Sequence, residues 1–209
     1  MTDTLIIVFV KNIKLGKVKT RLAKTIGNQG AFEVYSELVN VTEQATKNTA
    51  TDKRIYFSDA IVNSKWAGHY KAVQNGENLG ERMKNAFTEG FKAGYKRIIL
   101  IGSDLPDISA EHLENGLNAL RINDVVFGPA EDGGYYLIGL TKMYDFIFEN
   151  KPWSQPHLLE QTLSELKTQS VKFSTLITLN DIDTFEDLIA STFYKNNTAL
   201  QTRIQQLND

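Results

Sequence analysis

Hydrophobic runs alternate along the chain with amphipathic segments. Residues 5–10 and 97–102 are almost continuously apolar, which is typical of strands that are buried on both faces of a parallel sheet. Shorter runs of β-branched and aromatic residues predict further strands at 54–58, 124–127, 135–140 and 171–176. Apolar residues at helical spacing predict helices at 29–47, about 79–93 and about 157–167.

Capping residues indicate two further helices. Ser109 is a candidate N-cap for a helix whose leucines face the core. Thr184 is followed three residues later by Asp187, which predicts a capped helix near the C-terminus. The stretch from Asn196 onward is polar, and we expect a helix there at most.

The order of these elements predicts the fold class. Alternating strands and helices are typical of an α/β fold, here a three-layer α/β/α sandwich around a mainly parallel mixed sheet. No repeat, linker or low-complexity segment interrupts the pattern, so residues 1–209 are expected to form a single domain.

Composition excludes several classes of protein. The 209 residues include no cysteine, which rules out a disulfide framework, a thiolate zinc site and a cysteine nucleophile. Three scattered histidines offer neither an all-histidine metal site nor a triad, and structural or exposed roles are expected for them. A formal charge of −2 argues against a nucleic-acid partner. The longest apolar run is too short to span a bilayer, and the N-terminus lacks signal-peptide features, so we expect a cytoplasmic protein.

A basic segment follows the first predicted strand, and it contains no carboxylate. Its cations are Lys11, Lys14, Lys17, Lys19, Arg21 and Lys24. Ligands of open α/β sheets bind beyond the carboxyl ends of strands, so the segment is a candidate anion site; the alternative is a solvated basic loop. It matches neither standard phosphate motif, because Gly16-Lys17 is followed by Val18 and no G-x-G-x-x-G follows any strand.

Aspartates stand at two further strand or helix ends. Asp104 follows the central buried strand and could present a hard oxygen ligand to Mg²⁺ together with substrate phosphates; the alternative is a turn or helix cap. Asp183 could supply a second ligand or simply help a helix begin.

Two polar motifs remain. Glu131 and Asp132 precede Gly133-Gly134 and could position or deprotonate a sugar hydroxyl, or they could be exposed acids at a tight hairpin. Arg82, one turn into a helix, could reach a phosphate or pair with a neighbour. Right-handed crossovers bring strand ends to one edge of the sheet. Cations and carboxylates converging there are what a nucleotide diphosphate with a divalent metal requires.

Five ordered blocks between about residues 5 and 190 together resemble one known family. The blocks are Lys11 with KTRL at 19–22, LGERM at 79–83, GSDLP at 102–106, GPAEDGGYY at 128–136 and DIDT at 181–184. The family is the glycosyltransferase-A-like group long labelled a domain of unknown function, also described as the radical-SAM/selenodomain-associated transferases linked to arsenosugar synthesis. The chain is more distantly similar to phospholactate and molybdopterin guanylyltransferases.

The resemblance implies a nucleotide-diphospho-sugar transferase (GT-A, Rossmann-like) fold that uses Mg²⁺ or Mn²⁺. It makes Asp104 a catalytic, metal-binding aspartate and Asp183 a second metal ligand, with Asp132 or Glu131 orienting or deprotonating the acceptor. The residues that it implies in nucleotide and phosphate binding are Lys11, Lys19, Thr20, Arg21, Arg82 and Ser103. Those implied in binding the acceptor or sugar are Gly133, Gly134 and Tyr135.

Three functions are compatible with these residues. The first is a metal-dependent glycosyltransferase that moves a sugar from a nucleotide-diphosphate sugar to a small acceptor. The second is a guanylyl- or cytidylyltransferase that acts on a small phosphorylated acceptor and releases pyrophosphate. The third is a non-catalytic nucleotide-binding subunit. The expected partners are a nucleotide sugar or nucleoside triphosphate and a small acceptor; no oligomeric state is predicted.

Overall fold

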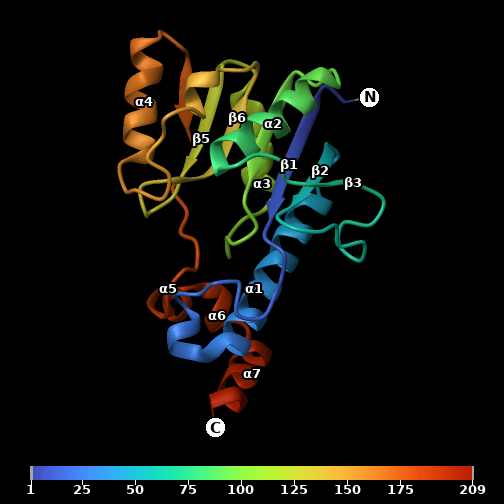
Figure 1. Ribbon diagram of the computed structural model, residues 1–209, viewed down its shortest axis with the longest axis vertical. Coiled ribbons are helices and arrows are strands. Elements are labelled where there is room, and N and C mark those ends of the chain that lie inside the picture. Colours follow the sequence, from blue (N-terminus) through green and yellow to red (C-terminus); the bar gives the residue numbers. More distant parts are fainter. Residues whose placement is uncertain (1, 209) are drawn as a thin grey trace.

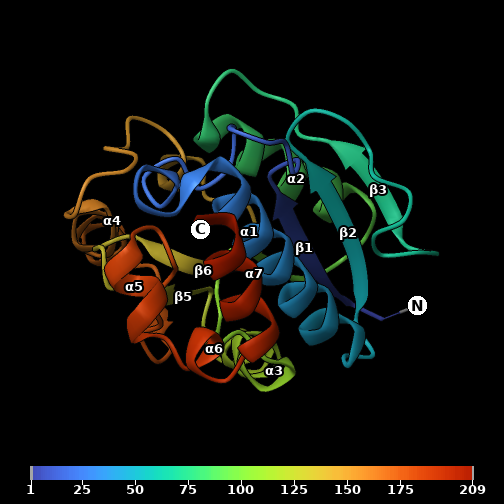
Figure 2. The same ribbon diagram turned by 90° about the horizontal axis from the view of Figure 1, so that it is seen from below.

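The computed structural model describes residues 2–208, which form a seven-stranded sheet with helices on both faces (Figures 1 and 2). The strands are β1 (Thr4–Val10), β2 (Asp52–Phe57), β3 (Tyr70–Val73), β4 (Arg97–Ile101), β5 (Val125–Pro129), β6 (Tyr135–Leu140) and β7 (Phe173–Thr175). The helices are α1 (Ala23–Lys47), α2 (Leu79–Lys92), α3 (Ala110–Ala119), the 3₁₀ helix η1 (Asp145–Ile147), α4 (Leu158–Thr168), α5 (Phe185–Ala190), α6 (Thr192–Lys195) and α7 (Thr198–Asn208). Among the described residues, no helix combines the length and hydrophobicity needed to cross a membrane.

The sheet is mixed but mainly parallel, as the alternation of elements predicts. Its strand order is β3-β2-β1-β4-β6-β5-β7, and every neighbouring pair is parallel except the two pairs that involve β6. Ile6 of β1 lies opposite Ile99 of β4, which in turn lies opposite Gly139 of β6. The carboxyl ends of β1, β4, β5 and β7 and the start of β6 therefore lie at one edge of the sheet.

Alternation along β1 builds the three layers. Ile6 and Val8 are fully buried in a core that includes residues of α1 and α3, whereas Leu5 and Ile7 are fully buried in a second core with residues of α2 and α4. Successive side chains of a strand point to opposite faces, so one continuous apolar run supplies both cores. The prediction that residues 5–10 form a strand buried on both faces is confirmed.

A third hydrophobic cluster lies outside the sheet and holds the C-terminal helices in place. Leu22 and Leu38 from the α1 region contact Leu188 of α5 and Leu200 of α7, and all four are fully buried. Figure 1 shows α5, α6 and α7 together beneath the sheet, beside the start of α1. The polar stretch after Asn196 is therefore a packed helix, because one face of it carries enough apolar residues to cover α1.

Two elements differ from the sequence-based expectation, and one capping prediction is confirmed. The first long helix begins at Ala23 and not at 29, and it is interrupted at Gly27, whose φ of 73° only glycine adopts readily. Strand β3 was not predicted, since it is a short edge strand with exposed side chains at both ends. Ser109 does cap α3, and its backbone N–H donates to Nδ1 of His112 at 3.2 Å.

The docking of α7 can be tested with two leucines of the same helix. Leu200 is fully buried, and Leu207 is 46% exposed. Leu200→Ala should lower the free energy of unfolding by about 2–4 kcal/mol, because it removes buried methyl groups and leaves a cavity. Leu207→Ala should change it by less than about 0.5 kcal/mol. Urea unfolding followed by circular dichroism gives both values, and equal effects of the two substitutions would contradict the packing of α7 on α1.

Candidate functional site

Four loops meet at the carboxyl edge of the sheet and carry the candidate residues. These loops are 11–22 after β1, 102–109 after β4, 130–134 between β5 and β6, and 176–184 after β7. The last two are joined by backbone bonds: Leu179 N–H donates to the Pro129 carbonyl at 3.1 Å, and Glu131 N–H donates to the Leu179 carbonyl at 3.2 Å. The topology thus brings together residues that are more than 160 positions apart in the sequence.

Lys19 forms the central ion pair of this edge. Its Nζ donates to Oδ2 of Asp104 at 3.0 Å and lies 3.8 Å from Oδ2 of Asp181. Only 7% of the Lys19 side chain is exposed, against 40% for Asp104 and 28% for Asp181. Burial disfavours a charged ammonium, but the two aspartates outweigh it and hold the pKa of Lys19 above its usual value. The lysine is therefore a buried group whose charged form is favoured by its two aspartate partners.

The backbone at Lys19 is strained. Its φ of 45° lies in the left-handed region, which costs a residue other than glycine roughly 1 kcal/mol or more. Strain of this kind persists only where surrounding contacts fix the conformation. The Lys19–Asp104 ion pair is such a contact, because it ties the end of β1 to the end of β4.

Asp181 and Asp183 flank Ile182, which is fully buried, and they reach different partners. Burial and the neighbouring Asp104 raise the pKa of Asp181 to about 6, although Lys19 opposes the shift. Asp183 instead accepts a hydrogen bond from Nη1 of Arg21 at 2.8 Å. Asp181 therefore shares Lys19 with Asp104, whereas Asp183 pairs with Arg21.

Tyr35 of α1 anchors the start of the basic segment. Its hydroxyl accepts the Lys11 backbone N–H at 3.0 Å and lies 2.8 Å from the Ser103 hydroxyl. Ser103 is 3% exposed, so its polar group is satisfied in the core beside Asp104. This network orients the backbone of two loops and leaves the Lys11 side chain exposed.

Two hollows flank this network. A hollow of about 270 Å³ is bounded by Lys11, Ser103 and Asp104 on one side and by Gln74 and Arg82 on the other. Arg82 donates through Nε to the Gly76 carbonyl at 3.0 Å, which holds its guanidinium at the rim. A smaller hollow of about 180 Å³ lies around Lys19 and is lined by Lys11, Val18, Lys19, Thr20, Tyr35, Asp104 and Asp183.

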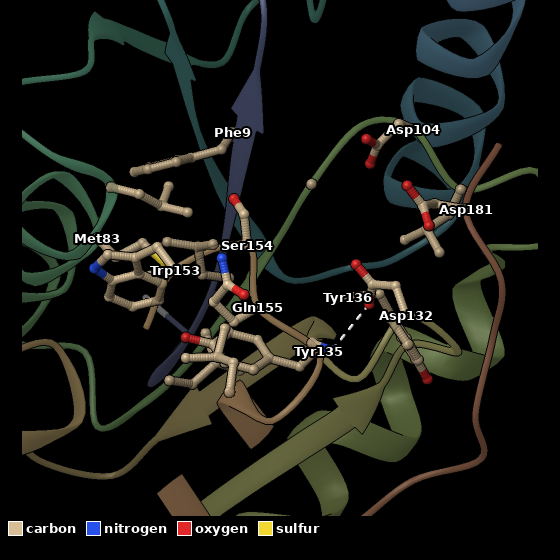
Figure 3. A pocket seen from close by; sticks show the side chains of 18 residues that line it. Phe9, Met83, Asp104, Asp132, Tyr135, Tyr136, Trp153, Ser154, Gln155 and Asp181 are labelled. Atoms are coloured by element: carbon tan, nitrogen blue, oxygen red, sulfur yellow. Dashed lines mark hydrogen bonds between the residues drawn. The ribbon is translucent and has the colours of Figure 1, made fainter. Parts of the chain in front are cut away.

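A third cavity, of about 360 Å³, opens on the other side of Asp104. Its polar wall carries Asp104, Asp132 and Asp181, and Tyr135 is also part of its lining. Figure 3 shows the three carboxylates together at one end, with Phe9, Met83 and Trp153 at the other. Asp104 lines all three hollows, so they meet at this carboxylate.

The β5–β6 loop orients Asp132 and turns Glu131 outward. Oδ1 of Asp132 accepts the backbone N–H of Gly134 at 2.9 Å, which fixes the carboxylate at the cavity. Glu131 is exposed and is not among the residues that line the three hollows. At Gly133, φ is +86° and a Cβ atom would lie 1.8 Å from the Pro156 carbonyl oxygen, so only glycine fits.

The structure therefore gathers most of the predicted site residues at one place. Lys11, Lys19, Thr20, Arg21, Arg82, Ser103, Asp104, Asp132, Gly134, Tyr135 and Asp183 line a hollow or contact a residue that does. Glu131 points away from the cavities, and Gly133 supports the loop without lining a cavity.

Sequence reasoning missed Asp181 and the apolar half of the third cavity, which Asp104, Asp132 and Asp181 line. The signal for Asp181 was the polar-apolar-polar alternation in Asp181-Ile182-Asp183. A buried isoleucine between two aspartates indicates that both acids face away from the core. The apolar half comes from Phe9, Met83 and Trp153, which the sequence places on unrelated elements, so no local pattern could reveal it.

Asp104 and Asp181 provide part of the oxygen ligand set that a divalent cation requires. Asp104 and Asp181 share one cationic partner and offer the hard oxygen atoms that Mg²⁺ and Mn²⁺ prefer. Within residues 2–208, no group of three acidic or histidine side chains is arranged to hold an ion by itself. The donor set therefore suits a cation that takes its remaining ligands from substrate phosphates and water.

Comparisons with known proteins agree with this fold. Residues 41–155 match the family described as "Uncharacterized protein conserved in bacteria (DUF2064)". The crystal structure of a Desulfovibrio desulfuricans protein, provisionally described as a nucleotide-diphospho-sugar transferase, is 32% identical over 99% of each chain, with a TM-score of 0.88. A search of curated proteins found no significant match.

More distant solved structures share the fold at low identity. The inositol-1-phosphate CTP transferase of T. maritima is 12% identical over 98% of this chain and 96% of that chain, with a TM-score of 0.60. Rv0371c of Mycobacterium tuberculosis, solved in complex with manganese, is 13% identical over 90% of this chain and 97% of that chain, with a TM-score of 0.52.

The resemblance drawn from the five sequence blocks is thus confirmed at the level of family and fold. The matched segment spans more than half of the chain and includes LGERM at 79–83, GSDLP at 102–106 and GPAEDGGYY at 128–136. Its seven-stranded α/β architecture matches that of the Desulfovibrio desulfuricans protein, and because the family model covers more than half of its length, this chain belongs to the DUF2064 family.

Proposed function

We propose that this protein is a metal-assisted transferase that moves a sugar from a nucleotide-diphosphate sugar to the hydroxyl group of a small acceptor. The observation that carries the proposal is the buried ion pair between Lys19 and Asp104, which joins a basic segment to an acidic cavity. A diphosphate needs cationic partners, and a metal-chelated diphosphate needs a carboxylate close by. These groups stand together beside a cavity of small-molecule size.

The reaction makes one bond and breaks one bond. The acceptor hydroxyl oxygen bonds to the anomeric carbon of the sugar, and the bond from that carbon to the β-phosphate oxygen breaks. Its electron pair leaves with the nucleoside diphosphate, and the hydroxyl proton passes to a carboxylate. Asp132 is our candidate for this base, because a backbone hydrogen bond orients it at the cavity.

Cationic side chains favour departure of the diphosphate. Negative charge grows on the leaving phosphate as the bond breaks, and fixed positive groups that face it stabilise the transition state. Lys19 is buried and charged, and Arg21 lies on the same side, paired with Asp183. The hollow between Lys11 and Arg82 has room for part of the nucleoside.

The acids of the site would hold a divalent cation, and the cation would neutralise charge on the diphosphate. Mg²⁺ or Mn²⁺ would be held by Asp104, with Asp181 or Asp183 as the second carboxylate, and would supply charge neutralisation at the diphosphate. Without such a cation, the Lys19 ammonium is the group that compensates Asp104 and Asp181. This arrangement leaves Lys19 free to turn to phosphate once its aspartates have another partner.

Nucleotidyl transfer is the second candidate, and the surplus of cations favours it. Lys11, Lys17 and Lys24 are exposed on the basic segment that also holds Lys19 and Arg21, and a triphosphate carries more charge than a diphosphate. In that reaction an acceptor phosphate oxygen bonds to the α-phosphorus of GTP or CTP, and pyrophosphate leaves with the electron pair of the broken bond.

Product analysis distinguishes these reactions. The protein is incubated with Mg²⁺ or Mn²⁺ and a panel of nucleotide sugars or nucleoside triphosphates, and nucleoside diphosphate and pyrophosphate are measured separately. Release of nucleoside diphosphate from a nucleotide sugar is expected. Release of pyrophosphate would favour nucleotidyl transfer, and nucleotide binding without either product would favour the non-catalytic subunit.

Substitution of Asp104 tests the centre of the site. Asp104→Asn should reduce metal-dependent turnover roughly a hundredfold or more, since one lost charged contact costs on the order of 3 kcal/mol in the transition state. Asp107→Asn is a matched control, because Asp107 is exposed on the same loop and, within residues 2–208, its side chain accepts a hydrogen bond from Thr192 alone. Equal turnover of the Asp104 variant and the wild type would remove Asp104 from the mechanism.

The raised pKa of Asp181 predicts a pH dependence of stability. The folded-state pKa of about 6 exceeds the ordinary value of 3.8, so the folded state binds the proton more tightly and wild-type stability falls as the pH rises from about 4 to 6. The Asp181→Asn variant has no carboxyl group at this position, so its free energy of unfolding does not fall in this way. At pH 7.5 it should exceed that of the wild type by about 1–3 kcal/mol.

The difference in the free energy of unfolding between Asp181→Asn and the wild type should shrink toward zero near pH 4. Urea unfolding in EDTA at a series of pH values measures it without a bound cation. Parallel stability curves for Asp181→Asn and the wild type would contradict the environment described for Asp181.

A further inference from the structure

The cavity of about 360 Å³ beside Asp104 has two chemically different ends. Asp104, Asp132 and Asp181 form the acidic end. The opposite end is apolar and aromatic, and Figure 3 shows Phe9, Met83, Tyr135 and Trp153 there; Leu79 and Leu158 also line the cavity. In the proposed function, sugar hydroxyls and phosphates contact the acidic end and the cationic segment, and the nucleoside lies in the hollow between Lys11 and Arg82, so the apolar end is left for the acceptor.

The apolar end is held open by the packing around it. Trp153 lies against α2 at Gly80, where an added Cβ would be 2.8 Å from the indole ring and 2.3 Å from the Phe148 carbonyl oxygen. Leu79, the first residue of α2, remains 46% exposed although it borders the cavity. A large apolar side chain left exposed beside an aromatic wall is a feature of surfaces that bind apolar ligands.

Tyr135 adds an unpaired polar group at this end. Its ring packs on Phe127 with the centroids 4.9 Å apart, and Figure 3 shows the side chain on the same side of the cavity as Trp153. Its hydroxyl is buried, and it is the one buried side-chain polar atom without a hydrogen-bond partner among the described residues. An unpaired buried hydroxyl is unfavourable, and a bound ligand can supply the missing partner.

We propose that the apolar end binds the acceptor, and that the acceptor is a small aromatic alcohol with a hydrogen-bond-accepting group at the end opposite its reactive hydroxyl. Its ring lies among Leu79, Met83 and Trp153, and its accepting group takes the hydrogen bond of Tyr135. Its reactive hydroxyl then faces Asp132 and the donor sugar. This inference rests on the proposed sugar transfer, because it assigns the second substrate of that reaction.

The dimensions of the cavity agree with such an acceptor. A volume of about 360 Å³ is at the lower end of the range of small-molecule sites, roughly 300–1,000 Å³. The volume suits one aromatic ring together with the transferred sugar and leaves no space for a long chain. The aromatic walls select flat molecules, and the acidic end disfavours acceptors that are themselves anionic there.

Binding of 4-hydroxyacetophenone, phenol and glycerol to the full-length protein tests the proposal by calorimetry. We expect 4-hydroxyacetophenone to bind, phenol to bind about fivefold to tenfold more weakly because it lacks the carbonyl acceptor, and glycerol not to bind measurably. Equal affinity for phenol and 4-hydroxyacetophenone would overturn the role of the Tyr135 hydroxyl. Failure of both aromatic probes to bind would overturn the acceptor class.

Tyr135→Phe should raise the stability of the protein and weaken its binding of 4-hydroxyacetophenone. Removing the unpaired hydroxyl should raise the Tm, while the preference for 4-hydroxyacetophenone over phenol should disappear. Tyr136→Phe is the matched control, since the Tyr136 hydroxyl already donates to the Ile177 carbonyl at 3.2 Å. That variant should lower the Tm and keep the preference. A preference that persists in Tyr135→Phe would overturn the proposed hydrogen bond.

Leu79→Ser provides a test that does not depend on Tyr135. Leu79 is half-exposed, so the variant should fold, and both aromatic probes should bind it several-fold more weakly than the wild type. Ile122→Ser is its control, because Ile122 is 70% exposed and does not border the cavity. Unchanged affinity in Leu79→Ser would overturn the assignment of this wall.

A parallel titration with nucleoside diphosphate and Mn²⁺ separates the two proposals. Nucleotide binding without aromatic binding would overturn the acceptor class and leave the proposed function standing. Aromatic binding without any nucleotide binding would overturn the proposed function, and with it the acceptor role of this end.

Discussion

The ion pair between Lys19 and Asp104 is the contact on which the arrangement of the site depends. It joins two residues that are 85 positions apart in the sequence, and it stabilises the left-handed backbone at Lys19. The Lys19 ammonium is also the cationic partner of Asp181. An ammonium that is almost fully buried persists only with such partners, because desolvation of an unpaired charge is costly. The hollows on either side of Asp104 therefore have a fixed common wall.

Charge and apolar surface are separated around that wall. Cations occupy the loop after β1, acids occupy the ends of β4 and the segments around β5 and β7, and the aromatic residues lie beyond them toward α2 and α4. Tight contacts keep these parts in place: Gly80 admits Trp153, and Gly133 admits the Pro156 carbonyl. A site of this kind presents different chemistry to the two partners of a transfer reaction and needs little rearrangement to bind them.

The accuracy of sequence-based prediction follows the origin of each signal. Continuous apolar runs predicted β1 and β4, because a strand buried on both faces has no polar positions. The capping residues Ser109 and Thr184 placed two helix starts, since capping is a local interaction. Strand β3 escaped prediction because its exposed edge position carries little hydrophobic pattern, and the packing of α7 escaped because its partner is a distant helix.

By itself the sequence determined the alternation of strands and helices, the basic segment after β1 and the acidic residues at the strand ends, because each depends on residue types at neighbouring positions. The tertiary structure decided which acid faces which cation. In the folded chain, Asp181 lies beside Lys19, Asp183 accepts a hydrogen bond from Arg21, and Glu131 is exposed to solvent. The tertiary structure also assembled the aromatic wall and buried the Tyr135 hydroxyl. Such outcomes depend on how strands order themselves in the sheet, which no local spacing encodes.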